Sequence, residues 1–191
     1  MQERLSNSCH QINSMVAELA ATQGETLINI SHQMAEIFTR GGQLILAGNG
    51  PLQAVAQQTA TAFSHRLGFD RPPLPAVSLG NDPIFIAALL ADQQPQEILA
   101  REYRLYSERE HMLVIFCSEN PSPQISHLIN QIEDSRALVL IGPPNKTGVR
   151  KEGHQALSLE LQGGSPARLA ELGLICGHLI CELVEGELFG V

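Results

Sequence analysis

The sequence lacks several features that would point to particular functions. Its 191 residues include no tryptophan and two tyrosines, and aromatic residues make up 4% of the chain. Proteins that bind single-stranded nucleic acid stack bases on aromatic side chains, so this composition argues against such a platform. Basic residues are scarce too, with 12 lysines and arginines against 20 acidic residues and a formal charge of −8. Because duplex binding requires a basic surface, any effect on DNA or RNA is expected to act through another protein.

Long apolar runs are also missing. The N-terminus opens with the polar run Met1-Gln2-Glu3-Arg4 and has no apolar signal core, so secretion is not expected. No segment approaches the roughly 18 uninterrupted apolar residues of a membrane span. The four cysteines form no C-x-x-C pair, which indicates free thiols in a reducing compartment. These absences predict a cytoplasmic protein without direct membrane contact.

What the sequence does contain is a regular alternation of short apolar runs and helical stretches. Unbroken apolar runs separated by helices are typical of a parallel sheet covered on both faces. The runs cover residues 44–47, 76–79, 112–116, 137–141 and 156–159. A long last helix is predicted over about 166–185. Its predicted inner stripe consists of Leu169, Leu172, Cys176, Leu179 and Leu183.

The first forty residues are predicted to be helical. Apolar residues recur at helical spacing between Leu27 and Phe38, and Gly41-Gly42 ends that segment. A less regular helix is expected over 3–22, with a break near Gln23-Gly24. Two such helices before any strand could form an interface arm, because they have apolar faces to bury.

No repeat, linker or low-complexity tract divides the chain. We therefore predict a single domain over 1–191, with a helical arm over 1–40 and a core over 41–191. The predicted fold class is α/β, a three-layer αβα sandwich with a five-stranded parallel sheet of flavodoxin-like type and additional N-terminal helices.

Ligands of open parallel sheets bind beyond the carboxyl ends of the strands. The loops 48–50, 80–82 and 117–122 follow three predicted strands and are rich in small polar residues. In the first loop, the backbone N–H groups of Asn49 and Gly50 could face a phosphate at a helix N-terminus. A tight turn with proline at the first helical position explains the same residues equally well.

The loop after the third strand offers further candidates. Ser118, Asn120 and Ser122 are hydroxyl and amide donors at another helix N-terminus, although Ser122 could simply cap that helix. Glu119 in the same loop opposes a phosphate site, because a carboxylate repels a phosphate beside it.

Taken in order, these segments resemble the sugar isomerase (SIS) domains of the phosphoheptose isomerase group. The resemblance rests on Gly-Gly-Gln-Leu-Ile-Leu-Ala-Gly-Asn-Gly, Pro-Ala-Val-Ser-Leu, the Ser/Asn loop and the segment from Ala167-Arg168 to Gly177-His178. Within that group the chain is similar to the DnaA initiator-associating proteins, through Met1-Gln2-Glu3-Arg4 and the pair Leu188-Phe189 just beyond the predicted last helix. The resemblance implies a sugar phosphate ligand and a homotetramer, at least a dimer, with sites between subunits.

The resemblance also assigns active-site positions, and this sequence departs from most of them. Leu52 stands where relatives have a phosphate-binding serine, and Glu119 stands where they have glycine. A histidine and a glutamate one helical turn apart are replaced by Gln58 and Ala62. Ala170 replaces a glutamine that faces the substrate. Isomerisation needs a base whose pKa lies near neutral pH and a partner acid, and alanine supplies neither.

Other positions are retained. By resemblance the ligand-binding residues are Asn49, Gly50, Asp82, Ser118, Asn120 and Ser122. Of the zinc ligands of relatives, only His178 and a poor amide at Gln58 remain, so no metal cofactor is expected. His178 could act as a base by itself, or it could lie on the polar side of the last helix near Glu171 and Glu182.

Three functions stay open at this point. The preferred hypothesis is a non-catalytic regulator or adaptor with a degraded phosphosugar pocket and the replication initiator DnaA as its partner. The alternative is an isomerase that converts sedoheptulose 7-phosphate to D-glycero-D-manno-heptose 7-phosphate for lipopolysaccharide, with His178 as acid/base. The third is an assembly module without a ligand. Leu188-Phe189 would pack on a neighbouring subunit or offer an apolar handle to a partner.

Overall fold

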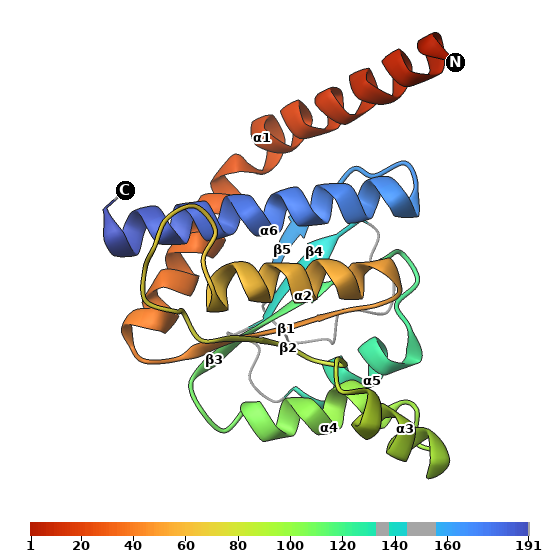
Figure 1. The fold of residues 1–191 in the computed structure, drawn as a ribbon, viewed down its shortest axis with the longest axis vertical. Coiled ribbons are helices and arrows are strands. Elements are labelled where there is room, and N and C mark those ends of the chain that lie inside the picture. Colours follow the sequence, from red (N-terminus) through yellow and green to blue (C-terminus); the bar gives the residue numbers. More distant parts are fainter. Residues whose placement is uncertain (133–137, 145–155, 191) are drawn as a thin grey trace.

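A computed structural model of the chain describes residues 1–132, 138–144 and 156–190 (Figure 1). Its elements are α1 Gln2–Thr39, β1 Gln43–Gly48, α2 Pro51–Ser64, β2 Ala76–Ser78, α3 Pro83–Ala91, α4 Glu97–Tyr106, β3 His111–Phe116, α5 Pro123–Gln131, β4 Leu138–Gly142, β5 Leu157–Glu160 and α6 Pro166–Phe189. The five strands form one parallel sheet in the order β2-β1-β3-β4-β5. This confirms the predicted α/β class and all five strand positions, although Ala137 lies outside the described residues.

Both faces of the sheet are covered by helices. Along β1, Leu44 and Leu46 belong to the core shared with α1, α2 and α6, whereas Ile45 and Ala47 belong to the core shared with α4 and α5 (Figure 1). Successive side chains of a strand point to opposite faces. Because both faces are buried, the strands are apolar along their whole length, which is why they appear as unbroken runs in the sequence.

The strand order creates a switch point beside β1. The chain passes from β1 outward to β2 and then returns to β3 on the other side of β1. The connections after β1 and β3 therefore leave in opposite directions, and a crevice opens between them at the carboxyl edge. The polar loops predicted to bind a ligand follow these strands.

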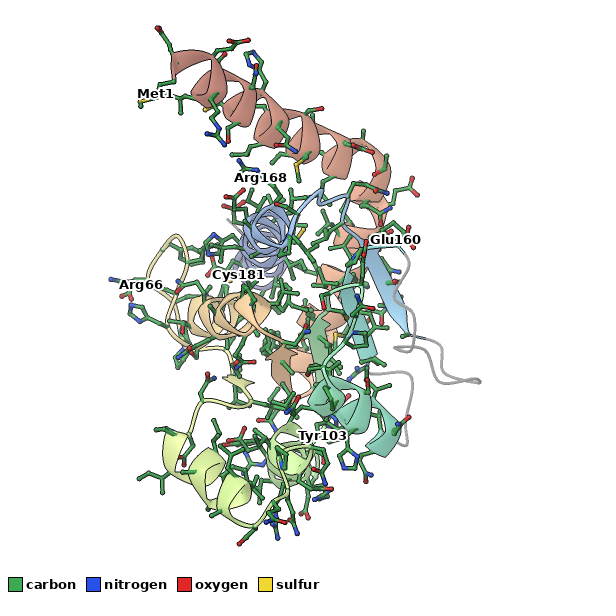
Figure 2. All side chains as sticks on the ribbon, turned by 90° about the vertical axis from the view of Figure 1, so that its right-hand side faces the viewer. Met1, Arg66, Tyr103, Glu160, Arg168 and Cys181 are labelled. Atoms are coloured by element: carbon green, nitrogen blue, oxygen red, sulfur yellow. The ribbon has the colours of Figure 1, made fainter. Side chains whose placement is uncertain are left out.

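The N-terminal arm is one helix, so the predicted break near Gln23-Gly24 is wrong. A glycine inside a helix costs about 1 kcal/mol relative to alanine, which is too little to interrupt a helix that is held elsewhere. The backbone N–H of Glu160 donates to Gln23 Oε1, and Arg168 donates to Ser8. Figure 1 shows α1 passing behind the C-terminal half of α6 while its first turns project past the body, and Figure 2 shows the same projection from the side. No described helix has the length and apolar character that crossing a membrane requires.

The last helix is longer than predicted and buries a different stripe. It continues to Phe189 rather than ending near 185. Leu183 is 40% exposed, and Val184 is fully buried in its place. The predicted stripe followed one edge of the buried face, whose centre lies at Gly173 and Gly177, where α2 approaches closely. A side chain at Gly177 would meet Thr59 Oγ1 at 2.2 Å.

A buried ion pair joins the segment after α2 to the end of α6. The Arg71 side chain is fully buried and its Nε donates to Glu185 Oε1 at 2.6 Å. Phe189 lies edge-on to Phe69, and the Arg71 guanidinium sits 6.0 Å from the Phe189 ring centre. Leu188 and Phe189 are therefore half-buried residues of α6 itself, and the prediction that they lie beyond the helix is wrong.

Candidate functional site

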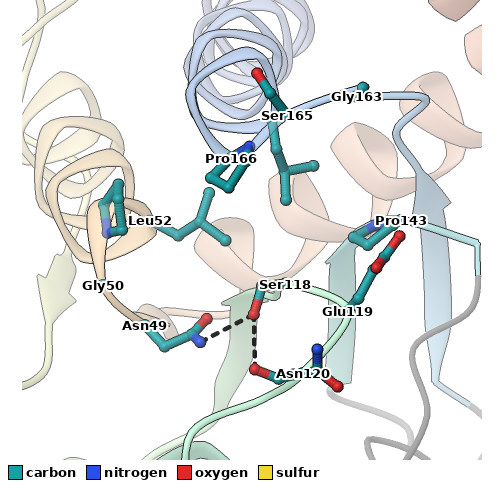
Figure 3. Close-up of a pocket in the computed structure, with 13 residues that line it drawn as sticks. Asn49, Gly50, Leu52, Ser118, Glu119, Asn120, Pro143, Gly163, Ser165 and Pro166 are labelled. Carbon is teal, nitrogen blue, oxygen red and sulfur yellow. Dashed lines mark hydrogen bonds between the residues drawn. The ribbon is translucent and has the colours of Figure 1, made fainter.

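A cavity of about 440 Å³ opens at the carboxyl edge of the sheet (Figure 3). It is called the main cavity below. Loops that follow β1, β3, β4 and β5 surround it, so it lies at the switch point where ligands of this sheet type bind. Its lining consists of residues 49–52, 118–120, Pro143, 163–166 and Leu169.

Four of the predicted ligand-binding residues line the main cavity: Asn49, Gly50, Ser118 and Asn120. A hydrogen-bond relay connects three of them. Asn49 Nδ2 donates to Ser118 Oγ at 3.0 Å, and Ser118 Oγ donates to the Asn120 carbonyl at 2.8 Å (Figure 3). The relay joins the loops after β1 and β3 across the switch point and holds their geometry.

The first turn of α2 adds no free amide to the predicted phosphate cradle of Asn49 and Gly50. Pro51 has no N–H, the amide of Leu52 donates to the Asn49 carbonyl at 3.1 Å, and the amide of Gln53 donates to the Gly50 carbonyl at 3.1 Å. Gly50 adopts φ 54, a conformation that favours glycine. The positive end of the helix dipole remains, but these two amides are already used.

Two predicted residues lie outside the main cavity. Ser122 Oγ accepts from the Ile125 amide at 3.3 Å and caps α5, as the structural alternative proposed. Asp82 caps α3 by accepting from the amides of Ile84 and Phe85, and it lines neither of the two cavities described here.

Ser122 instead lines a second cavity of about 230 Å³. This second cavity lies beside the first, because Asn49 and Gly50 line both. Its lining consists of residues 48–50, Gln53, Gly80, 98–99, Ser122 and Gln124.

The positions that the resemblance assigns to catalysis lie away from both cavities. Gln58 is exposed on α2, whereas Ala62 is 4% exposed and belongs to the core. His178 is half-buried, and its Nε2 is a buried atom without a hydrogen-bond partner in the described part of the chain. His178 lies on the side of α6 that carries the exposed residues Glu171 and Glu182, with its ring partly covered.

The residues present do not fit the zinc ion that the resemblance implies. Within 1–132, 138–144 and 156–190, no three histidine, cysteine, aspartate or glutamate side chains gather closely enough to hold a metal. Burial raises the pKa of Cys176 and of Cys181 to about 12, so both thiols are protonated and poor ligands.

Carboxylates lie close to both cavities. Glu119 lines the main cavity. Behind the second cavity, Glu102 accepts a hydrogen bond from the Gly80 amide, and burial together with the charge of Asp82 raises the pKa of Glu102. These groups make both cavities less favourable for an anion than the helix dipoles alone would.

Sequence reasoning missed half of the main cavity. Pro143 and residues 163–166 line it from the loops after β4 and β5. The rule that ligands bind at the carboxyl ends of parallel strands applies to both of these loops as well. Gly163-Gly164-Ser165 also has the small polar composition of the loops 48–50, 80–82 and 117–122 that were predicted to bind a ligand. Gln53, which lines the second cavity, was missed as well, because no pattern in the sequence indicates that its side chain bonds to the ends of β1 and β2.

Comparison with known proteins gives a consistent picture. No protein-family model matches the chain. The chain is 27% identical over 188 residues to the phosphoheptose isomerase of Burkholderia pseudomallei (strain 1710b), covering 97% of this chain and 95% of that protein. It is also 27% identical over 168 residues to the phosphoheptose isomerase of Roseiflexus sp. (strain RS-1), covering 88% and 85%.

Solved structures share the fold. A phosphoheptose isomerase from Francisella tularensis superposes with a TM-score of 0.81 at 17% identity over 96% of this chain and 97% of that one. The phosphoheptose isomerase of Neisseria gonorrhoeae gives 0.78 at 19% identity over 97% and 98%. A protein of Escherichia coli CFT073, solved in complex with a sugar phosphate, gives 0.51 at 11% identity over 96% and 93%.

Proposed function

This chain is a phosphoheptose isomerase-like SIS-domain protein, and from this premise we propose that its main cavity binds a sugar phosphate without isomerising it. The volume of about 440 Å³ falls within the range of roughly 300–1,000 Å³ usual for small-molecule sites. The helices α2 and α6 begin at its wall, so their positive ends favour an anionic group. The name shared by the curated relatives supports the ligand class.

The main support for the proposal that the bound sugar is not isomerised is the absence of an acid–base pair on α2. Moving a proton between neighbouring carbons requires a base within hydrogen-bonding reach of the substrate and an acid to complete the transfer. At the two α2 positions where the resemblance expects this chemistry, Gln58 is exposed and Ala62 is a buried alanine. Glu119 is the one titratable side chain among the described residues that line the main cavity.

Isomerisation of sedoheptulose 7-phosphate to D-glycero-D-manno-heptose 7-phosphate, for lipopolysaccharide heptose synthesis, is the second candidate. The names of the curated relatives favour it over a regulatory role. His178 would then serve as acid/base, and its unpartnered Nε2 is the group available for that task. The substrate would have to reach a nitrogen that is buried in the single chain.

A regulatory role extends the first candidate, because a protein that binds a sugar without converting it can act through contact with a partner. We propose a homotetramer with DnaA as that partner, which the surface around Leu188 and Phe189 would contact. Phe189 already packs on Phe69, so Leu188→Ala is the cleaner probe of this surface. It should weaken capture of purified DnaA without shifting the oligomer mass; unchanged capture would contradict the assignment.

The experiment that separates the candidates measures binding and turnover on the same sample. Sedoheptulose 7-phosphate and glucose 6-phosphate are titrated by calorimetry, and sedoheptulose 7-phosphate is then followed by NMR with and without added zinc. Binding without aldose formation is the expected result. Turnover that disappears in His178→Ala would establish the isomerase instead. If neither sugar binds, the third function, an assembly module without a ligand, is favoured.

A further inference from the structure

The strands β1 and β2 separate in an unusual way at their carboxyl ends. The last direct hydrogen bond between them joins the Leu79 amide to the Leu46 carbonyl at 2.8 Å. In a parallel ladder with this register, the next bond would join the Gly48 amide directly to the Leu79 carbonyl. These two groups do not bond to each other here.

The carboxamide of Gln53 stands between them. The Gly48 amide donates to Gln53 Oε1 at 3.2 Å, and Gln53 Nε2 donates to the Leu79 carbonyl at 2.5 Å. Because an amide can only donate and a carbonyl can only accept, the orientation of the Gln53 side chain is fixed. The side chain thus acts as an inserted rung that continues the ladder.

This rung is not needed to satisfy the backbone. Without it, the Gly48 amide and the Leu79 carbonyl could bond to each other directly, as the ladder predicts. What Gln53 adds is width, since a whole carboxamide separates two groups that would otherwise meet. The loop after β2 is held in this open position from its other side, where the Gly80 amide donates to Glu102.

The second cavity lies in the space that this width opens. Gln53 lines it together with Gly48 and Gly80, which sit on the two separated strand ends. None of the described side chains that line it is charged, and the carboxylate of Glu102 lies behind Gly80. The second cavity therefore suits an uncharged, hydroxyl-bearing group rather than a phosphate.

We propose that Gln53 is a specificity-determining positioning residue: by spacing β1 from β2 it keeps the second cavity open, so that the site accepts sugar phosphates with a long carbon chain. This rests on the proposed function. Asn49 and Gly50 line both cavities, so a ligand in the main cavity can extend past them into the second. A seven-carbon sugar phosphate reaches the second cavity, and a five-carbon one does not.

The test compares sedoheptulose 7-phosphate with ribose 5-phosphate by calorimetry on wild type and Gln53→Ala. Wild type should bind the seven-carbon sugar about tenfold more tightly, the gain expected of one or two added hydrogen bonds. In Gln53→Ala the strand ends can close, and the seven-carbon sugar should lose about this factor while the five-carbon sugar is unchanged. The matched control is Asn81→Ala, which removes a side-chain partner of Gln53 at 3.2 Å but keeps the rung and should keep the preference.

Each other outcome has a distinct meaning. If neither sugar binds wild type, the proposed function fails. If wild type binds both sugars equally, or if Gln53→Ala weakens both in parallel, the site exists but Gln53 does not set its length preference. Should Gln53→Ala fail to fold, the wild-type comparison alone still decides whether a preference exists, and loss of the preference in Asn81→Ala would also contradict the role of the rung.

Discussion

The two halves of α2 differ in their polar chemistry. In its first turn, Gln53 bonds to the ends of both β1 and β2, and Asn49 just before the helix bonds to Ser118. In its later turns, Gln58 points to solvent and Ala62 is part of the core. In the proposed function, the first half positions the ligand, whereas the second lacks groups that move protons. Under that proposal, binding and proton transfer depend on separate stretches of one helix, and one can be lost while the other is kept.

The largest expected effect comes from the buried ion pair between Arg71, which follows α2, and Glu185 of α6. Arg71→Ala leaves the Glu185 carboxylate buried and unpaired, and such changes cost about 3–5 kcal/mol. Urea unfolding should show this loss, while the protein that stays folded should bind a sugar phosphate normally. Arg66→Ala is the control, because it breaks an exposed pair with Asp70 and should change the unfolding free energy by less than about 1 kcal/mol. Equal losses in both variants would contradict a special role of the buried pair.

A second prediction concerns the contact between α2 and α6. Gly177→Ala places a methyl group 2.2 Å from Thr59 Oγ1, so the helices must separate, at a cost of about 1–3 kcal/mol. Gly24→Ala is the matched change, since nothing lies within 4 Å of its new side chain and it should stabilise the protein by up to about 1 kcal/mol. Thermal unfolding of the two variants should shift in opposite directions. A shift in the same direction would mean that helix propensity rather than packing decides the outcome.

A third prediction tests whether the second half of α2 can be made catalytic. Gln58→His combined with Ala62→Glu should give no sedoheptulose 7-phosphate isomerisation, because neither position lines the main cavity and Leu52 and Glu119 still do. The variant that adds Leu52→Ser and Glu119→Gly is the comparison, and the fold of both variants is checked by circular dichroism because Ala62→Glu places a carboxylate in the core. NMR detection of aldose with the first pair alone would show that the cavity was ready for catalysis and would undermine the binding-only proposal.

The smallest expected effect is a pH dependence behind the second cavity. Burial raises the pKa of Glu102, so folding favours its protonated form, and its contribution to stability is lost as pH rises through the raised pKa. Glu102→Gln should remove that loss, which urea unfolding between pH 4 and 7 would detect. Glu97→Gln should act with the opposite sign, because Arg104 lowers the pKa of Glu97 and its contribution is lost as pH falls. The same sign in both variants would refute this interpretation of Glu102.

Much of the fold was predictable from local patterns. The five strands appeared as apolar runs because helices cover both faces of the sheet, and their boundaries came out within a residue or two. The continuous α1 was not predicted, since its integrity depends on contacts such as Glu160 with Gln23 that are 137 residues apart. The length of α6 was underestimated for a similar reason: the acidic residues near its end, among them Glu185, are held by partners elsewhere in the chain.

The candidate site was only half predictable. Asn49 and Ser118 could be found because the loops after β1 and β3 must meet at the switch point. Gln53 and Arg71 could not, because their roles depend on partners 26 and 114 residues away that no spacing in the sequence reveals. His178 could be singled out by resemblance, but its burial depends on how α6 packs.

The central claim is that the main cavity binds a sugar phosphate and leaves it unchanged. The most direct measurement is an NMR spectrum of sedoheptulose 7-phosphate incubated with the purified protein. The account predicts ³¹P resonances broadened by exchange with bound ligand and no aldose signal after prolonged incubation. Formation of D-glycero-D-manno-heptose 7-phosphate well above the rate of a His178→Ala control would contradict it.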